Sequence, residues 1–198
     1  MTVDDIWNHN LQYQPVLLEA MPPGCGTALD VGCGQGFLLK HLAARADTVL
    51  GIDQHAPSLA EAAERTVGLP NVELLDGDAM TYDFGRQFDA VFSIAVIHHL
   101  PFEPGLRRMR DLTAPGGVLG VVGLAGSTTL RDYARDGVGA VETRVRRLRR
   151  SFTMVTAPVC DPDESYTEVR RIVADVMPGA RYRRHNLFRY SIVWTRPR

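Results

Sequence analysis

Long apolar runs are missing from this chain of 198 residues. No stretch approaches the roughly 18 unbroken apolar residues that a transmembrane helix needs. Residues 1–5 also lack the basic segment and apolar core with which a secretory signal begins. We therefore expect a cytoplasmic protein without a membrane partner.

Cysteine is scarce, and its spacing matches no metal site. Cys25, Cys33 and Cys160 form no CxxC pair and have no histidine at zinc-ligand spacing. An odd, scattered set of thiols suits a reducing compartment, so we expect three free cysteines and no bound metal. With 45% hydrophobic residues, a chain of this length buries a core that needs no disulfide. We expect one domain spanning residues 1–198, as a monomer or homodimer.

Lysine is almost absent, because Lys40 is the only lysine among the 22 basic residues. A bias toward arginine arises from codon composition alone, so it does not by itself indicate a nucleic-acid partner. The charges are nevertheless divided along the chain. Residues 1–100 hold 13 acidic and 4 basic side chains (net -9), whereas residues 101–198 hold 10 and 18 (net +8), which gives the total of -1.

Strand-like and helix-like segments alternate over the first two thirds of the chain. The pattern predicts strands at 27–31, 48–53, 72–75, 88–95 and 117–124, with helices at 37–46, 58–67 and 103–112, after one short helix that stops before Pro22. Such alternation is typical of an α/β fold, in which helices cover both faces of a mostly parallel sheet.

The regular alternation ends after Leu124. Residues 128–150 are helix-prone but contain Gly137 and Gly139, which predict an interruption. A proline-containing loop at 155–164 and a helix at 166–177 follow. The last two strands, at 181–184 and 188–195, are predicted to form an antiparallel hairpin.

The strongest local signal is the glycine-rich turn after the first predicted strand. Glycines 32, 34 and 36 permit positive φ and let the backbone approach a ligand closely. Phe37 occupies the position at which a dinucleotide fingerprint requires its third glycine, which disfavours a nicotinamide or flavin cofactor. Asp30, just before the turn, is placed to accept hydrogen bonds from a cationic ligand. A tight turn without any ligand is the alternative.

Two further acids close the next two strands. Asp53 comes 17 positions after Gly36, close to the roughly 20-residue offset at which an acid binds ribose hydroxyls. Asp78 follows the third strand and is placed to accept a hydrogen bond from an exocyclic amine. Each acid alone is equally well explained as a helix cap. Three such acids in order along one sheet favour a nucleoside-containing ligand.

These segments resemble the signatures of class I S-adenosylmethionine-dependent methyltransferases. The resemblance runs from about residue 15 to residue 124 and resumes in the closing strands. Within that family, the segment Val96-Ile97-His98-His99-Leu100 is similar to one in small single-domain bacterial enzymes. The matching segments are Asp30-x-Gly32-x-Gly34-x-Gly36, Gly51-Ile52-Asp53, Gly77-Asp78-Ala79, Phe88-Asp89-x-Val91-x-Ser93 and Leu112-x-x-Pro115-Gly116-Gly117.

The resemblance implies a Rossmann-like sheet of seven strands with the last strand antiparallel, and S-adenosylmethionine as cofactor. It assigns the methionine portion of the cofactor to Asp30 and the glycine turn, including Cys33. It assigns the ribose to Asp53, and the neighbouring Gln54 is also expected to bind the cofactor. It also implies adenine contacts from Asp78 and Ala79. The backbone of Ser93 and Ile94 would lie beside the sulfonium.

His98 and His99 stand where the acceptor meets the methyl group in this fold. An imidazole titrates near neutrality, so one of them is a candidate general base. The alternative is that one histidine caps the strand end and the other faces solvent. A metal site is disfavoured, because neighbouring side chains of an extended strand point to opposite faces.

Two segments are expected to cap the site. Residues 1–23, with Trp7, His9 and Tyr13, resemble the segment that folds over the cofactor. Tyr13 or His9 is a candidate to contact the cofactor or to line the substrate opening. Trp7 packing under the first helix is the alternative. The irregular insertion at 125–165 is expected to build the substrate pocket.

The five arginines between Arg144 and Arg150 are expected to form a solvated helix face or, alternatively, a clamp for an anionic acceptor. The closing hairpin, with Arg183, Arg184 and Arg189, resembles the family's terminal strands and is expected to need no ligand. Nucleic acid is disfavoured, because no aromatic residues interleave with the arginines.

We therefore predict methyl transfer to O, N or C of a small-molecule acceptor. Methylation of a protein or RNA is the first alternative, although Ser93-Ile94-Ala95-Val96 is not the Asn/Asp-Pro-Pro-aromatic segment common in nucleic-acid amino-methylating enzymes. The remaining alternatives are an oxidoreductase and a cofactor-binding protein without transfer activity.

Overall fold

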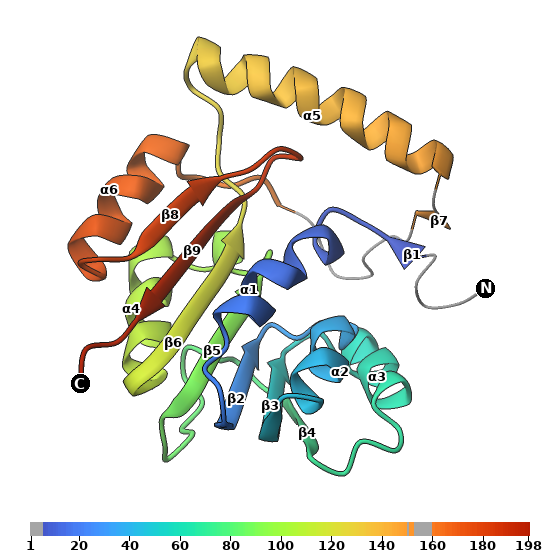
Figure 1. Cartoon of the computed structure of the whole chain (residues 1–198), viewed down its shortest axis with the longest axis vertical. Coiled ribbons are helices and arrows are strands. Elements are labelled where there is room, and N and C mark those ends of the chain that lie inside the picture. The colour runs from blue at the N-terminus through green and yellow to red at the C-terminus, as the bar shows by residue number, and fades with distance from the viewer. Residues whose placement is uncertain (1–5, 150, 153–159) are drawn as a thin grey trace.

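A central sheet of seven strands forms the body of the molecule (Figure 1). The computed structural model describes residues 6–149, 151–152 and 160–198. The strand order is β4-β3-β2-β5-β6-β9-β8. The strands are β2 (Cys25–Val31), β3 (Ala46–Asp53), β4 (Val72–Asp76), β5 (Phe88–Ile94), β6 (Thr113–Gly123), β8 (Arg181–Arg184) and β9 (Tyr190–Thr195).

The direction of the strands confirms the predicted fold class. Strands β4, β3, β2, β5 and β6 pair in parallel, while β9 pairs antiparallel with both β6 and β8. The chain runs outward from β2 to β4 and then restarts at β5 on the other side of β2. Ligands of open α/β sheets bind at such a reversal, outside the carboxyl ends of the strands.

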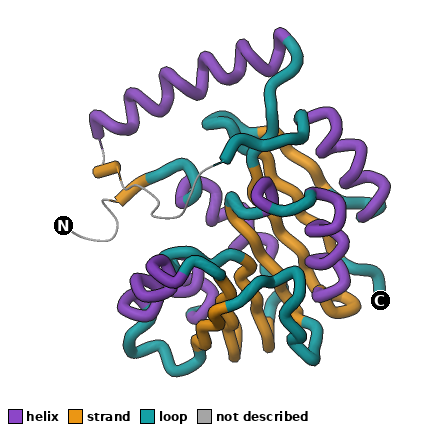
Figure 2. Tube along the Cα trace, turned by 180° about the vertical axis from the view of Figure 1, so that it is seen from behind, coloured by secondary structure: helices purple, strands orange, loops and turns teal. Residues whose placement is uncertain are grey.

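Helices cover both faces of the sheet (Figure 1, and from behind in Figure 2). One face carries α1 (Gln14–Ala20), α2 (Phe37–Ala43) and α3 (Ala56–Arg65), and the other carries α4 (Phe102–Leu112) and α6 (Tyr166–Val176). Alternate side chains of β2 enter separate cores: Ala28 packs with Leu17 and Leu39, and Leu29 packs with Leu106 and Val173. Successive side chains of a strand point to opposite faces of the sheet, so Ala28 and Leu29 enter different cores.

Helix α5 (Leu130–Arg149) is continuous, so the interruption predicted at Gly137 and Gly139 was wrong. A Cβ added to Gly139 would lie 2.9 Å from the backbone nitrogen of Leu187. This glycine therefore lets the turn before β9 approach the helix. Arg184 of β8 also binds α5, through Asp132 at 2.5 Å and Asp136 at 3.0 Å.

Much of α5 stands apart from the sheet (Figure 1). Its exposed apolar side chains are Leu130, Tyr133, Val138, Val141 and Val145. None of the helices within the described residues is long and apolar enough to span a membrane.

The amino-terminal segment contacts both helix α5 and the short strand that follows it. A short parallel ribbon, β1 (Ile6–Trp7) with β7 (Ser151–Phe152), was not predicted from sequence. His9 Nε2 lies 3.1 Å from Thr143 Oγ1 of α5. The 3₁₀ turn η2 (Leu11–Tyr13) and α1 follow, and α1 ends before Met21 as predicted. Part of the loop predicted at 155–164 lies outside the described residues.

Candidate active site

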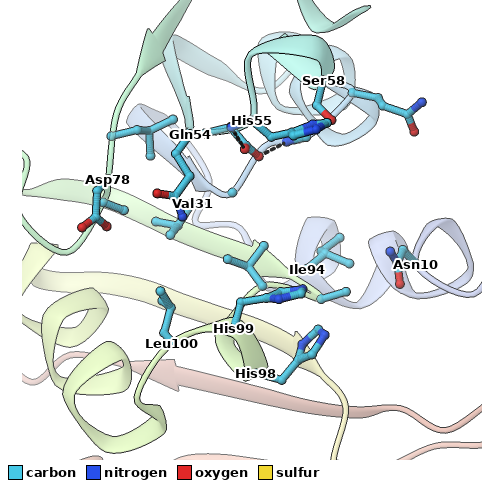
Figure 3. Close-up of a pocket in the computed structure, with 18 of the residues that line it drawn as sticks. Asn10, Val31, Gln54, His55, Ser58, Asp78, Ile94, His98, His99 and Leu100 are labelled. Carbon is cyan, nitrogen blue, oxygen red and sulfur yellow. Dashed lines mark hydrogen bonds between the residues drawn. The ribbon is translucent and has the colours of Figure 1, made fainter. Parts of the chain in front are cut away.

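A cavity of about 480 Å³ opens at the carboxyl ends of β2, β3, β4 and β5. Its volume lies within the range of small-molecule sites. Gln54, His55 and Ser58 line one side, and His98, His99 and Leu100 line the opposite side (Figure 3). The predicted site residues that line this cavity are Gly32, Gly34, Asp53, Gln54, Asp78, Ala79, Ile94, His98 and His99.

A second cavity of about 90 Å³ adjoins the first under the amino-terminal segment. Asp30 and Cys33 line it from the sheet side, and Asn8 and Gln14 line it from the amino-terminal segment. Five residues line both cavities: Asn10, Gly32, Gly34, Gln35 and Ile94. Asp30 therefore lines the small cavity, and Asp53 and Asp78 line the large cavity beside it.

Glycine is required at the three positions of the turn for different structural reasons. All have positive φ, of 69° at Gly32, 50° at Gly34 and 76° at Gly36. A Cβ on Gly32 would lie 2.2 Å from Val96 Cγ2, and one on Gly36 would lie 2.9 Å from the Cβ of Ala62 in α3. Open space surrounds Gly34. Gly36, which lines neither cavity, thus serves helix packing, whereas Gly34 exposes its backbone to the ligand space.

Asp53 ties the glycine turn to the end of β3. Its Oδ2 accepts a hydrogen bond from the Gly34 N–H at 2.7 Å, and its Oδ1 accepts one from the His55 N–H at 2.9 Å. An ionised carboxylate offers about four acceptor positions. Asp53 thus keeps acceptor capacity for hydroxyl groups in the cavity.

Asp78 has a similar double arrangement in the next turn. Its Oδ1 accepts a hydrogen bond from the Met80 N–H at 2.9 Å, which closes a turn within a loop. No helix begins at this turn, so the helix cap considered from sequence is absent at Asp78. The same side chain lines the large cavity. The turn and a ligand contact are compatible at this position, because the carboxylate has further lone pairs.

Asp30 is a buried acid with an unusual protonation equilibrium. Its side chain is 3% exposed, and no described residue donates a hydrogen bond to it. Burial, together with the nearby charge of Asp53, raises the pKa of Asp30 to about 8. A cationic group in the small cavity would stabilise its ionised form.

The end of β5 turns sharply into the large cavity. Ala95 has φ 57°, which is uncommon for a residue with a Cβ, and its N–H donates to Val122 O at 2.7 Å. Ser93 is buried and donates its hydroxyl to Val31 O at 3.0 Å, and it lines neither cavity. Ile94 lines both.

His98 and His99 lie together rather than on opposite faces. They belong to a 3₁₀ turn, η3 (Ile97–His99), and their ring centroids are 4.2 Å apart. Cys160 joins them, with its Sγ 3.0 Å from His99 Nδ1. One ligand atom from each of these three residues lies within 4.8 Å of the others. The sequence argument against a shared site assumed an extended strand, and that assumption was wrong; the absence of a bound metal stays a prediction.

His98 is held in its neutral form. Burial, the neighbouring His99 and the charge of Arg189 lower the pKa of His98 to about 4. The imidazole is therefore unprotonated at neutral pH, and the same lowered pKa makes it a weak base.

Tyr13 lies off the cavities. Its hydroxyl donates to Asn186 O at 2.6 Å, and its ring centroid is 4.6 Å from that of His185. Its role as a cofactor contact stays a prediction, and Asn10 lines both cavities in its place.

Asn10 and Arg189 are cavity residues that the sequence analysis did not assign, and Cys160 is a neighbour that it did not foresee. Asn10 and Arg189 lie in segments that resemble those of the family, but the sequence analysis gave neither residue a role, and Cys160 belongs to no motif. Only the tertiary fold brings them to the strand ends.

Comparison with known proteins agrees with this geometry. Residues 28–117 match the family model described as a methyltransferase domain. An uncharacterized methyltransferase of Mycobacterium tuberculosis is 32% identical over 98% of this chain and 100% of its own length. A Streptomyces fradiae dTDP-3-amino-3,6-dideoxy-alpha-D-glucopyranose N,N-dimethyltransferase is 34% identical over 52% of this chain and 41% of that protein.

Among solved structures, DhpI in complex with S-adenosylhomocysteine is similar in fold and sequence. The TM-score is 0.58 at 27% identity, over 87% of this chain and 78% of that one. The chain belongs to the class I S-adenosylmethionine-dependent methyltransferases, and S-adenosylmethionine is its cofactor.

Proposed function

We propose that the protein transfers the methyl group of S-adenosylmethionine to a small-molecule acceptor inside the 480 Å³ cavity. The observation that carries the proposal is the division of this cavity. Strand-end acids line the part next to the glycine turn, and His98 and His99 line the opposite side. One space thus holds a nucleoside-binding part and a proton-accepting part.

The residues around the small cavity fit the methionine portion of the cofactor. Asp30, buried without a described hydrogen-bond donor, has the charge needed to bind an ammonium group. Gly32 and Gly34 allow the backbone to approach the ligand, because neither carries a side chain at the cavity wall. Cys33, in the same turn, completes this wall.

The residues around the large cavity fit an adenosine group. Asp53 has lone pairs for ribose hydroxyls, with Gln54 beside it, and Asp78 with Ala79 is placed to contact adenine. Ile94 and the backbone of Ser93 are proposed to flank the sulfonium. In this assignment the apolar surface of Ile94 excludes water from the reacting atoms.

The bound cofactor supplies a methyl group that is already activated by its sulfonium. The protein therefore has to align the acceptor and exclude water. His98 lines the cavity in its neutral form, so it is a candidate to receive the proton that an O–H or N–H acceptor releases, acting as a weak base because its pKa is lowered. His99 lies beside it and is the second candidate base.

The size of the cavity supports a small acceptor over a macromolecule. Residues 1–23 and 125–165, which contact each other through β1 and β7, are proposed to cap the cavity. The S. fradiae relative is named for a nucleotide-sugar acceptor, which supports the same class. A protein or RNA acceptor would instead require this cap to open.

Calorimetric titration with S-adenosylmethionine, S-adenosylhomocysteine and NADH tests the cofactor assignment. We expect both adenosyl ligands to bind, NADH not to bind, and Asp53→Ala to weaken binding by about tenfold or more, as for loss of a charged hydrogen bond. Asp47→Ala is the matched control, because it removes an exposed carboxylate from the other end of β3. Tight binding of NADH without binding of S-adenosylmethionine would refute the proposal.

The histidines are tested by turnover once an acceptor has been found by screening small molecules for methyl transfer. His98→Ala or His99→Ala should slow turnover while cofactor affinity stays unchanged. Normal turnover of both variants would exclude a histidine base.

A further inference from the structure

Arg189 is a buried cation at the wall of the large cavity. Arg189 is 7% exposed and directly precedes β9. Nε and Nη2 donate to Asn10 Oδ1 at 3.3 and 2.7 Å, and Nη1 donates to the Phe188 carbonyl at 3.4 Å. Both acceptors are neutral. Of the five guanidinium N–H groups, two remain without an acceptor in the described part of the chain.

The neighbouring strand shows how this fold neutralises a buried arginine that serves structure alone. Arg184 of β8 has a side chain that is 9% exposed, and it is paired with both Asp132 and Asp136. Buried charges are ordinarily paired in this way, because desolvation makes an unpaired charge costly. No carboxylate of the described residues pairs with Arg189.

Arg189 keeps its positive charge at neutral pH. Burial lowers the pKa of its guanidinium to about 10, against the opposite influence of Tyr166 and Tyr13. Arg189 is also close enough to His98 to lower the pKa of that imidazole. Arg189 lines the large cavity together with His98 and His99 and does not line the small one, so the cation lies in the space where the acceptor is expected.

We propose that Arg189 binds an oxyanionic group of the methyl acceptor, a carboxylate or a phosphonate. This inference rests on the proposed function, because it concerns the acceptor part of the same cavity. An arginine fork with two remaining N–H groups matches the two oxygens of such an anion. The anion would supply the negative charge that no described carboxylate supplies to Arg189.

The anion site proposed at Arg189 differs from the one considered from sequence, which lay among the five arginines at 144–150. Arg144, the first of the five arginines at 144–150, is exposed on α5, and the side chains of the other four lie outside the described residues. Arg189 stands in the hairpin for which the sequence analysis expected no ligand. Its burial without a counter-ion is the reason for revising that expectation.

The test uses the full chain saturated with S-adenosylhomocysteine and three small probes. Acetate and methylphosphonate represent the two anion classes, and acetamide is the uncharged match for acetate. We expect nuclear magnetic resonance titration to detect binding of at least one anion and not of acetamide. Arg189→Gln should weaken that binding by about tenfold or more, and Arg189→Lys should weaken it less, because lysine keeps the charge but not the fork.

Two control variants separate anion binding from other effects of Arg189. Arg183→Gln removes an exposed arginine of the same hairpin and should leave anion affinity within about twofold, as for a screened surface charge. Asn10→Ala removes the side-chain acceptor of Arg189 but keeps the cation. If Arg189 only fastens the amino-terminal segment, Asn10→Ala will reproduce the loss caused by Arg189→Gln, and the proposal is wrong.

The outcomes also separate this inference from the proposed function. Failure of S-adenosylhomocysteine to bind the wild-type protein would refute the function itself. Normal cofactor binding with equal anion binding by wild type and Arg189→Gln, or with no anion binding at all, would refute the role of Arg189 alone. If Arg189→Gln fails to fold in a thermal melt, the comparison of wild type with Arg189→Lys decides.

Discussion

We predict that Asp30 makes cofactor binding a proton-linked reaction. The pKa of this buried carboxyl group is raised to about 8 by burial and by Asp53, so about nine in ten molecules carry a proton on Asp30 at about pH 7. An ammonium group in the small cavity favours the ionised carboxylate. Binding of S-adenosylmethionine should therefore displace this proton.

The size of the effect follows from the position of the pKa. About 0.9 proton should be released per cofactor bound at about pH 7. The ionised fraction of Asp30 rises from about 0.01 at pH 6 to about 0.09 at pH 7, so affinity should rise about ninefold over that interval. The sign is fixed, because a raised pKa means that the free protein binds the proton that the ligand must displace.

Calorimetry in buffers of different ionisation enthalpy measures the proton release directly. Asp30→Asn keeps the shape of the side chain but cannot ionise, so it should release no proton and show an affinity independent of pH. 5′-Methylthioadenosine, which lacks the amino-acid portion, should likewise release none from the wild-type protein. Equal proton release by wild type and Asp30→Asn, or a wild-type affinity that does not change with pH, would refute the assignment of Asp30 to the ammonium group.

Two further predictions concern the glycine turn and the thiols. Gly32→Ala should destabilise the fold by about 2–4 kcal/mol, since it adds the strain of positive φ to a clash with Val96, whereas Gly34→Ala should cost about 1–2 kcal/mol and mainly weaken cofactor binding; equal shifts in melting temperature would contradict this. Iodoacetamide should modify Cys160 alone in the native protein, because it is exposed while Cys25 and Cys33 are buried. Mass spectrometry should find one adduct and none in Cys160→Ser, and additional adducts on the native protein would contradict the burial of the other two.

Local patterns predicted the parallel strands well but placed their boundaries less well. The first helix after the glycine turn was predicted to reach residue 46, yet α2 ends at Ala43 and Ala46 already begins β3. The two elements follow each other so closely that an apolar pattern continues across the boundary. Strand β6 begins at Thr113, four residues before the predicted start, because Pro115 and Gly116 are accommodated inside it.

The acids of the predicted site could be identified from sequence because each lies at, or just after, the carboxyl end of a strand. In a parallel sheet, consecutive strand ends meet at one edge, so Asp30, Asp53 and Asp78 were expected to share a site. Arg189 and Asn10 are 179 positions apart and meet only through the packing of the amino-terminal segment on the closing strands. No spacing rule reaches that distance. Cys160 likewise comes to His99 from a position 61 residues later.

The division of charge along the sequence acquires a specific meaning in the cavity. Under the proposed function, the acidic half of the chain would supply the three carboxylates that hold the cofactor, Asp30, Asp53 and Asp78. The basic half would supply one buried cation for the acceptor, Arg189, because Arg184 is already neutralised by Asp132 and Asp136. A cofactor held by these acids would offer an anionic acceptor at Arg189 a second positive charge, which the demethylated cofactor would lack. We therefore expect the acceptor to bind more tightly together with S-adenosylmethionine than together with S-adenosylhomocysteine.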